Sequence, residues 1–145
     1  MKKIVTDTSV IVKWVSSENE PHLAEADQIL RDVQSGKVVL SAPELAKYEL
    51  GNALLKKGFS PSQAYQSLST IYSLPIQFVP ETEELATETY DLAHEVRSAS
   101  SPSFTYYDAA FAALTRQTNA LLVTDNPKHH SKIKGINVIP LEKYK

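Results

Sequence analysis

The feature that most constrains the fold is the alternation of short apolar runs with longer helical ones. Short runs rich in β-branched residues predict strands over residues 3–6, 38–40, 76–79, 121–124 and 136–139. Apolar residues at helical spacing predict helices over residues 22–35, 43–58, 60–72, 81–97 and 104–118. Strands that alternate with helices in this way form a parallel sheet covered on both faces. We therefore expect a single domain over residues 1–145, a three-layer α/β/α sandwich around a mostly parallel sheet of about five short strands.

Start and stop signals place several helix ends. Ser60 precedes Pro61, and Gln63 follows in the spacing of a capping box. Ser41 and Glu44 have the same spacing around Pro43, which predicts a second capping box there. Glycine favours the position just after a helix, so residue 36 is expected to end the helix over residues 22–35.

Composition excludes several classes of protein. Hydrophobic residues make up 42% and charged residues 22% of the 145 residues, which is typical of globular rather than disordered chains. The formal net charge of −2 gives no general attraction for nucleic acid or membrane, so a polyanion would have to be bound locally or through metal. The chain has no cysteine, which excludes disulfides, thiolate metal sites and a cysteine nucleophile.

The apolar runs are too short for a membrane protein. No run reaches the roughly 18 residues that a membrane-spanning helix needs. Lys2 and Lys3 look like the start of a signal peptide, but Asp7 interrupts the apolar stretch that follows. We expect a cytoplasmic protein with no membrane partner.

The letters Val-Thr-Asp occur twice, at residues 5–7 and 123–125, each time at the end of a predicted strand. Ligands of open parallel sheets bind beyond the carboxyl ends of the strands, where Asp7 and Asp125 are expected to lie. Each aspartate also has a structural interpretation. Asp7 could cap a helix through the N–H groups that follow it. Asp125 precedes Asn126 and Pro127, which is a turn signature.

Two further carboxylates lie on the apolar sides of predicted helices. Glu49 is four residues after Leu45, at the edge of an apolar stripe, where it could also be a charged residue at the rim of the core. Asp108 is four residues after Phe104 and three before Phe111. A carboxylate there is costly to bury without a partner, and helix propensity gives no reason for an aspartate inside a helix.

A cluster of these four carboxylates would need neutralising charge. Like charges about 4 Å apart repel by about 4 kcal/mol at an effective dielectric near 20. No Lys or Arg lies immediately beside Asp7, Asp108 or Asp125 in the sequence, which favours a divalent cation. Oxygen ligands without cysteine or an embedded histidine favour Mg²⁺ or Mn²⁺ over Zn²⁺.

Four segments in order resemble the PIN-domain ribonucleases, and among them the VapC-type toxins of toxin–antitoxin systems. They are Ile-Val-Thr-Asp-Thr-Ser-Val at 4–10, Tyr-Glu-Leu-Gly-Asn-Ala-Leu at 48–54, Tyr-Asp-Ala-Ala-Phe-Ala-Ala-Leu at 107–114 and Leu-Val-Thr-Asp at 122–125. Each segment alone is weak evidence, but their order, spacing and the total length all fit, so the resemblance covers nearly the whole chain.

The resemblance implies a metal-dependent endoribonuclease, the toxin of a type II toxin–antitoxin pair. Asp7, Glu49, Asp108 and Asp125 would be both the catalytic and the Mg²⁺- or Mn²⁺-binding residues. RNA would be the substrate, cleaved to a 5′-phosphate and a 3′-hydroxyl, and an antitoxin protein would be the partner of a homodimer.

The same resemblance gives roles to neighbouring residues. Ser9 would support Asp7, and Asn52 would neighbour Glu49. Some members carry a further acidic residue shortly after the last motif, where this chain has Asn126, Pro127 and Lys128, so a second metal site stays open. Local basic residues would supply RNA affinity, the candidates being Lys13, Lys47, Lys56, Lys128 and Lys132.

Other interpretations compete with this one. The chain could be a catalytically silent module of the same fold that binds RNA or protein. Aspartyl-phosphate chemistry would use Asp7 as a nucleophile, but it calls for a second aspartate where Ser9 stands. His129 and His130 are expected to be exposed loop residues. Trp14 and several tyrosines could form a dimer face or an antitoxin groove, although core packing is the simpler expectation.

Overall fold

The computed structural model describes residues 1–130 and 133–145 and contains one five-stranded sheet. Its strands lie in the order β3-β2-β1-β4-β5, and every neighbouring pair is parallel. They are β1 (Lys2–Thr6), β2 (Val38–Pro43), β3 (Gln77–Val79), β4 (Leu121–Thr124) and β5 (Asn137–Pro140). The predicted α/β fold with a parallel sheet is therefore confirmed.

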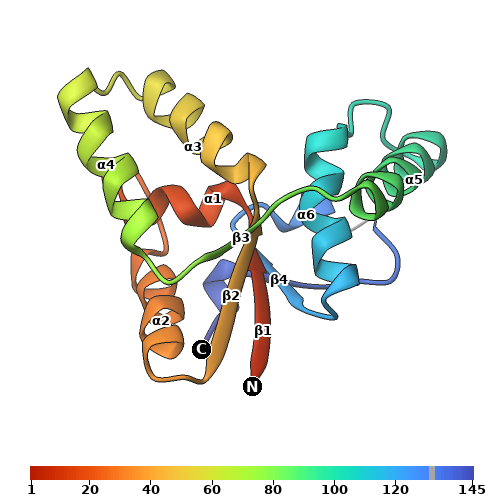
Figure 1. Cartoon of the computed structure of the whole chain (residues 1–145), viewed down its shortest axis with the longest axis horizontal. Coiled ribbons are helices and arrows are strands. Elements are labelled where there is room, and N and C mark those ends of the chain that lie inside the picture. The colour runs from red at the N-terminus through yellow and green to blue at the C-terminus, as the bar shows by residue number, and fades with distance from the viewer. Residues whose placement is uncertain (131–132) are drawn as a thin grey trace.

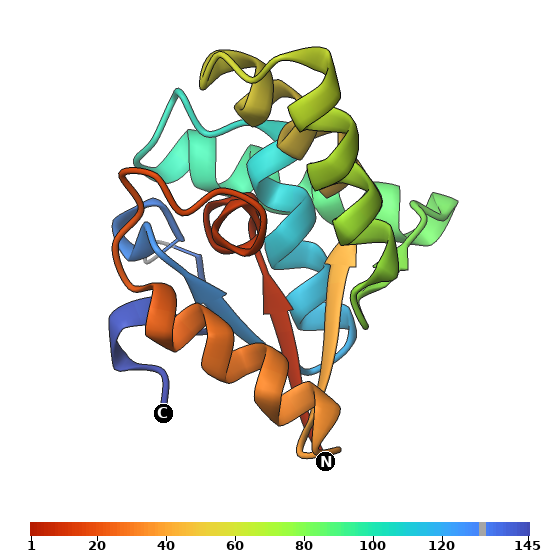
Figure 2. The same ribbon diagram turned by 90° about the vertical axis from the view of Figure 1, so that its left-hand side faces the viewer.

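Helices cover both faces of this sheet. They are α1 (Thr8–Ile11), α2 (Leu23–Gln34), α3 (Leu45–Lys56), α4 (Pro61–Ser73), α5 (Glu83–Ala99), α6 (Tyr106–Gln117) and α7 (Pro127–His130), with 3₁₀ turns η1 (Val12–Trp14) and η2 (Leu141–Lys143). Figures 1 and 2 show α1 to α4 on one face, and α6 on the opposite face with α5 outside it. No helix in the described part of the chain is long and apolar enough to cross a membrane.

The core consists of two groups of buried apolar side chains. The larger group lies between the sheet and its helices, and includes Ile4, Ile29, Leu40 and Leu50. The smaller group joins α5 to α6 around Phe104. Because α1 and α6 pack on opposite faces of β1 and β4, the carboxyl ends of these central strands lie between the two sets of helices.

Of the two capping boxes predicted for α3 and α4, one is confirmed and the other is wrong. Ser60 caps α4, and its side chain and that of Gln63 bond to each other's backbone N–H groups. The box at Ser41 is absent, because residues 41–43 extend β2 and pair with β3. The backbone N–H of Glu44 continues this pairing by donating to Val79, so α3 begins only at Leu45.

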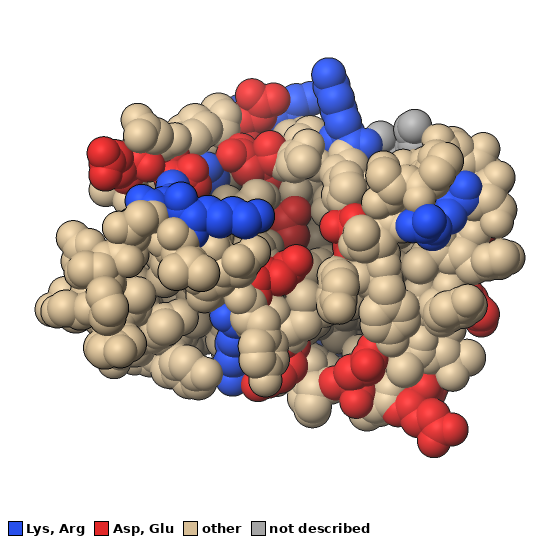
Figure 3. Space-filling view, turned by 90° about the horizontal axis from the view of Figure 1, so that it is seen from above, with Lys and Arg blue, Asp and Glu red and all other residues tan. Residues whose placement is uncertain are grey.

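The helices diverge beyond the carboxyl ends of the strands. In Figure 1, α3 and α4 extend to one side of the sheet, while α5 and α6 lie on the other. Figure 3 looks onto this edge and shows the surface hollowed between the two sides. The predicted ligand-binding edge of the sheet thus opens to the surface.

Candidate functional site

The ends of two adjacent strands bring Asp7 and Asp125 to the same edge of the sheet. Asp7 follows β1 and Asp125 follows β4, and these strands pair through Thr6 and Val123. The last residue of β4, Thr124, donates from its hydroxyl to Oδ2 of Asp7 at 2.6 Å. This contact ties the first carboxylate to the neighbouring strand.

The interpretation of Asp7 as a helix cap is wrong. Asp7 occupies the N-cap position of α1 in an extended conformation, but its side chain bonds no backbone N–H of that helix. Its oxygens instead accept from the hydroxyls of Ser9 and Thr124, and Nε2 of His130 lies 3.3 Å from Oδ2. Asp7 is 8% exposed, and among the described residues only side chains bond to its carboxylate.

Glu49 reaches the same region from α3. Thr8, the residue after Asp7, donates its hydroxyl to Oε1 of Glu49 at 2.7 Å. Burial raises the pKa of the Glu49 carboxyl, and the negative charges of Asp108 and Asp7 raise it further, against the opposing effect of the Thr8 hydrogen bond. Asp7 and Asp108 are therefore each near enough to Glu49 to repel its negative charge.

Asp108 belongs to the first turn of α6 rather than to its interior, because the helix begins at Tyr106. The backbone N–H of Asp108 donates to the Thr105 hydroxyl, and the Thr105 N–H donates to Oδ2 of Asp108, both at 3.0 Å. An aspartate is favoured in this position, so the expectation that local preferences do not explain it was wrong.

Asp108 also has a partner outside its helix. Nε2 of His129 lies 2.9 Å from Oδ2 of Asp108. Burial alone would raise the pKa of this carboxyl, but hydrogen bonds from Thr105 and His129 outweigh it and lower the pKa. The two nearby arginines bond elsewhere, Arg97 to the Phe104 carbonyl and Arg116 to Glu88.

Asp125 differs from the other three because a lysine neutralises it. Nζ of Lys13 lies 2.9 Å from Oδ2 of Asp125, and the Lys13 side chain is only 1% exposed. We expected no basic residue among the four carboxylates, and this expectation is wrong at Asp125. The helical turns α1 and η1 bring Lys13 back to the edge that Asp7 occupies. The proposed role of Lys13 as an RNA contact also fails, because its side chain is buried.

The expectation that His129 and His130 are exposed loop residues is confirmed for the exposure of His129, but it is wrong for His130 and for the loop. They end the short helix α7, and His130 is 3% exposed beneath the surface. Each histidine faces a different carboxylate, His129 that of Asp108 and His130 that of Asp7. The sequence around the two histidines could not predict these contacts, because Asp108 and Asp7 are distant from them in the chain.

The two supporting residues named from the sequence have different surroundings. Ser9 donates to Asp7 and accepts from the backbone N–H of Asp125 at 3.0 Å, so it joins both strand ends. Asn52 is exposed, and within the described residues no hydrogen bond links it to Glu49. The hydroxyl that holds Glu49 belongs to Thr8, and the sequence did not predict this contact.

The residues present suit a hard divalent cation. Carboxylate oxygens are the ligands that Mg²⁺ and Mn²⁺ prefer. Burial is the main cause of the raised pKa of Glu49, and the negative charges of Asp108 and Asp7 add to it. Figure 3 shows acidic side chains along the hollow, with basic ones at parts of its rim. Over the described residues, no three acidic or histidine side chains are already arranged as a ligand set. Binding would therefore need carboxylate oxygens that hydroxyls and histidines now occupy.

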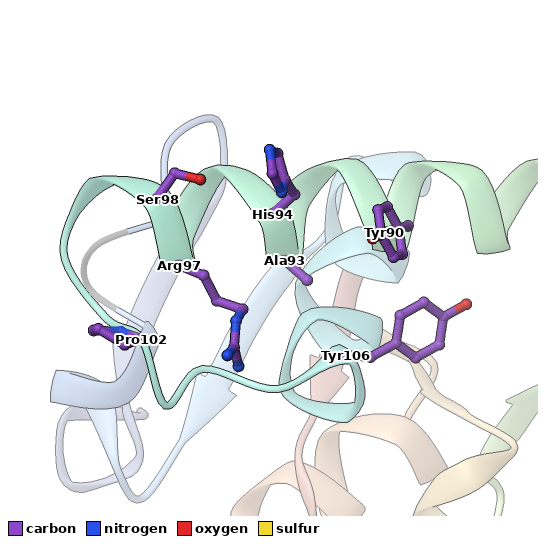
Figure 4. A pocket seen from close by; sticks show the side chains of 7 residues that line it. All are labelled: Tyr90, Ala93, His94, Arg97, Ser98, Pro102 and Tyr106. Carbon is purple, nitrogen blue, oxygen red and sulfur yellow. The ribbon is translucent and has the colours of Figure 1, made fainter.

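A separate pocket of about 480 Å³ lies between α5 and the loop that leads to α6. Figure 4 shows Arg97 pointing from α5 toward this loop, with Tyr106 and Tyr90 at the other end. None of the four carboxylates lines it. The Tyr106 hydroxyl bonds to Glu81, and burial together with this contact raises the pKa of Tyr106 to about 12.

Solved structures with the same fold include toxin–antitoxin proteins. VapBC2 of Rickettsia felis, bound to a promoter DNA fragment, aligns with a TM-score of 0.76 and 16% identity over 95% of this chain and 98% of that one. DNA-bound VapBC of Salmonella typhimurium aligns with a TM-score of 0.72 and 18% identity over 97% of this chain and 99% of that one. VapC20 of Mycobacterium tuberculosis is described as a sarcin–ricin loop cleaving toxin. It aligns with a TM-score of 0.62 and 16% identity over 84% of this chain and 87% of that one.

No curated protein matches this chain significantly by sequence. The family model described as PIN domain matches residues 4–135, a range that includes all four carboxylates and both histidines. This match covers most of the 145 residues. The chain therefore belongs to the PIN domain family.

Proposed function

We propose that this chain is a Mg²⁺- or Mn²⁺-dependent endoribonuclease. The observation that carries the proposal is the gathering of Asp7, Glu49 and Asp108 from three elements at the open edge of the sheet, where two of them raise the pKa of the third. Mutual repulsion gives such a cluster no advantage for folding. A cation that the cluster binds explains why the fold maintains it.

Asp7, Glu49 and Asp108 would hold the cation, which would supply Lewis-acid stabilisation of charge on a scissile phosphate. The chain orients each carboxylate with hydroxyl groups. Thr124 holds Asp7 at 2.6 Å and Thr8 holds Glu49 at 2.7 Å. The first turn of α6 fixes the backbone that carries Asp108. These hydrogen bonds keep the carboxylate side chains ordered, and a bound cation would compete with them for the carboxylate oxygens.

RNA is the proposed substrate. The Mycobacterium tuberculosis protein with this fold is described as cleaving the sarcin–ricin loop, which supports RNA as the class of substrate. Of the candidate basic residues, Lys47 pairs with Glu44 and lies over the rings of Tyr72 and Phe78. Lys56 is exposed at the end of α3. Lys132 lies outside the described residues, and Lys128 is a remaining candidate.

The proposal extends to a toxin role with an antitoxin partner. The Rickettsia felis and Salmonella typhimurium structures are VapBC assemblies on DNA, which supports a partner of that kind for this chain. We expect a homodimer in the cytoplasm. Expression of the wild type should arrest growth, expression of Asp7→Asn should not, and a small protein encoded by the neighbouring gene should relieve the arrest. Growth unaffected by the wild type would contradict the toxin role.

Cleavage of defined RNAs tests the enzyme proposal. Single-stranded and structured RNAs should be cut with Mn²⁺ or Mg²⁺ and not with a chelator, leaving 5′-phosphate and 3′-hydroxyl ends. Asp7→Asn should lower the rate by about 100-fold or more, because it removes a proposed metal ligand. Asp91→Asn is a matched control, since Asp91 is exposed on α5 and lies outside the site.

The catalytically silent alternative makes a different prediction. If wild type and Asp7→Asn are equally inert on every RNA, and Mn²⁺ leaves the thermal midpoint of the wild type unchanged, the enzyme proposal fails. A ligand that binds only the folded state must stabilise it. RNA binding without cleavage or Mn²⁺ binding would then favour the silent module.

A further inference from the structure

Lys13 is a buried lysine to which the proposed chemistry gives no role. It lies in η1, and its side chain is 1% exposed. A buried ammonium group is costly unless carboxylates or other acceptors compensate it. Its position beside the carboxylate cluster therefore calls for an explanation in terms of its partners.

Two carboxylates compensate Lys13. Its Nζ lies 2.9 Å from Oδ2 of Asp125 and 3.7 Å from Oε1 of Glu20. The other oxygen of Glu20 lies 3.9 Å from Nζ of Lys57, so charges of opposite sign alternate from Asp125 outward. Of the two lysines in this row of charges, Lys13 lies nearer to the site, where it pairs with Asp125.

Within the described part of the chain, the other three carboxylates have no such partner. Among the described residues, neither Lys nor Arg pairs with Asp7, Glu49 or Asp108, whose contacts are with hydroxyls, a backbone N–H and histidines. Their negative charge remains available for an external cation. The charge of Asp125 is already neutralised within the protein.

Asp125 also has a structural connection to Asp7. Its backbone N–H donates to the Ser9 hydroxyl, which in turn donates to Asp7. The ion pair with Lys13 holds the side chain of Asp125 at the end of β4. The backbone N–H of the same Asp125 positions Ser9. Lys13 can thereby act on Asp7 without touching it.

We propose that Lys13 serves as a built-in cation in place of a second metal ion. The chain then binds one divalent cation through Asp7, Glu49 and Asp108, while Asp125 positions Ser9 and is not a metal ligand. An ammonium group 2.9 Å from Asp125 occupies that carboxylate and repels a second cation. This inference rests on the proposed metal-dependent function and deepens it, because it assigns the number of metal ions.

Mn²⁺ binding measured by calorimetry tests the role of Asp125. The double variant Lys13→Met with Asp125→Asn removes both charges of the ion pair and nearly preserves side-chain volume, so it avoids leaving either group unpaired. We expect wild type to bind one Mn²⁺ per chain and the double variant to have a Kd within about threefold of it. Asp108→Asn should weaken binding by about tenfold or more.

The single variant Lys13→Met tests the replacement of a metal. It leaves Asp125 without its ammonium group, and we expect a second, weaker Mn²⁺ site, seen as a stoichiometry of two in calorimetry and Mn²⁺ electron paramagnetic resonance. Lys57→Met is the matched control, because Lys57 contacts Glu20 and not Asp125. This control should keep a stoichiometry of one.

The failures of the two proposals are distinguishable. If wild type binds Mn²⁺ but the double variant loses about tenfold or more in affinity, Asp125 is a metal ligand and only the inference about Lys13 falls. Two Mn²⁺ ions on wild type, or one on Lys13→Met, would also overturn it. No Mn²⁺ binding by wild type would overturn the proposed metal-dependent function itself.

Discussion

At the scale of single residues, the surroundings of each carboxylate decide what it can do. Asp7 stands where a helix cap would stand, yet hydroxyl groups of Ser9 and Thr124 take its oxygens. A cap satisfies backbone N–H groups, whereas this arrangement orients a carboxylate toward the open edge of the sheet. Position in the chain alone therefore does not distinguish the two roles.

Glu49 should show a conflict between stability and metal binding. Its raised pKa means that folding favours the protonated carboxyl, so ionisation costs stability as pH rises above the ordinary value. We expect Glu49→Gln to raise the thermal midpoint of the metal-free protein by about 2 °C at neutral pH, and to abolish Mn²⁺ stabilisation. Glu95→Gln, exposed on α5, should change neither. A lower midpoint for Glu49→Gln in metal-free buffer would contradict the prediction.

Asp108 should contribute to stability in the opposite pH range. Its pKa is lowered in the folded protein, so its contribution is present above the ordinary value of 3.8 and is lost as pH falls through the folded pKa. Urea unfolding should therefore show a smaller loss of stability from about pH 5 to about pH 3 in Asp108→Asn than in wild type. Identical losses in the two proteins would show that the contacts with Thr105 and His129 do not stabilise the carboxylate.

At the scale of elements, the first turn of α6 joins helix capping to the site. Thr105 caps the helix through the N–H of Asp108, whose side chain returns a bond to the Thr105 N–H. The same residue pair thus starts the helix and positions a proposed metal ligand. Thr82 caps α5 by the simpler contact with Leu85 and lies outside the cluster.

These two caps provide a matched pair of variants. Thr105→Ala and Thr82→Ala should each lower the free energy of unfolding by about 1 kcal/mol, because each removes one N-cap hydrogen bond. Only Thr105→Ala should also weaken Mn²⁺ binding, since it loosens the turn that carries Asp108. Chemical denaturation and calorimetry measure the two effects. Equal Mn²⁺ affinities in both variants would show that the Thr105 cap does not affect metal binding.

A second contact between elements fixes the C-terminal turn η2. Tyr144 donates its hydroxyl to Oδ2 of Asp32 in α2 at 2.8 Å, and both residues are buried. Tyr144→Phe should lower the free energy of unfolding by about 2 kcal/mol, because a buried carboxylate loses one hydrogen bond and, among the described residues, keeps the one from Gln28. Tyr90→Phe, at an exposed tyrosine, is the control in urea unfolding. Equal stability of the two variants would contradict this prediction.

At the scale of the whole molecule, the site lies where two groups of helices meet one sheet. Asp7 comes from the centre of the sheet, Glu49 from α3 on one face and Asp108 from α6 on the other. Unfolding of any one element would separate these carboxylates. Binding at the site should therefore be coupled to folding of the chain as a whole.

This coupling can be measured as metal-dependent stability. Mn²⁺ at about 100 times its Kd should raise the free energy of unfolding of wild type by about 2.7 kcal/mol. Asp7→Asn should show no such increase, and Asp91→Asn should match wild type. Urea unfolding with and without Mn²⁺ provides the measurement. An equal increase in wild type and Asp7→Asn would place the bound metal elsewhere.

The sequence by itself determined the strands, the helices and the edge of the sheet at which Asp7 and Asp125 lie, because apolar periodicity and chain direction are local properties. The tertiary structure alone decided the partner of each carboxylate. Thr124 and Asp7 are 117 residues apart, and Thr8 and Glu49 are 41 apart, so no local pattern encodes these contacts. Burial beside Asp125 likewise turned Lys13 from a candidate RNA contact into an internal counter-charge. Periodicity predicts the helix, strand or strand end on which a residue lies, whereas packing in three dimensions decides which charge or hydroxyl its side chain contacts.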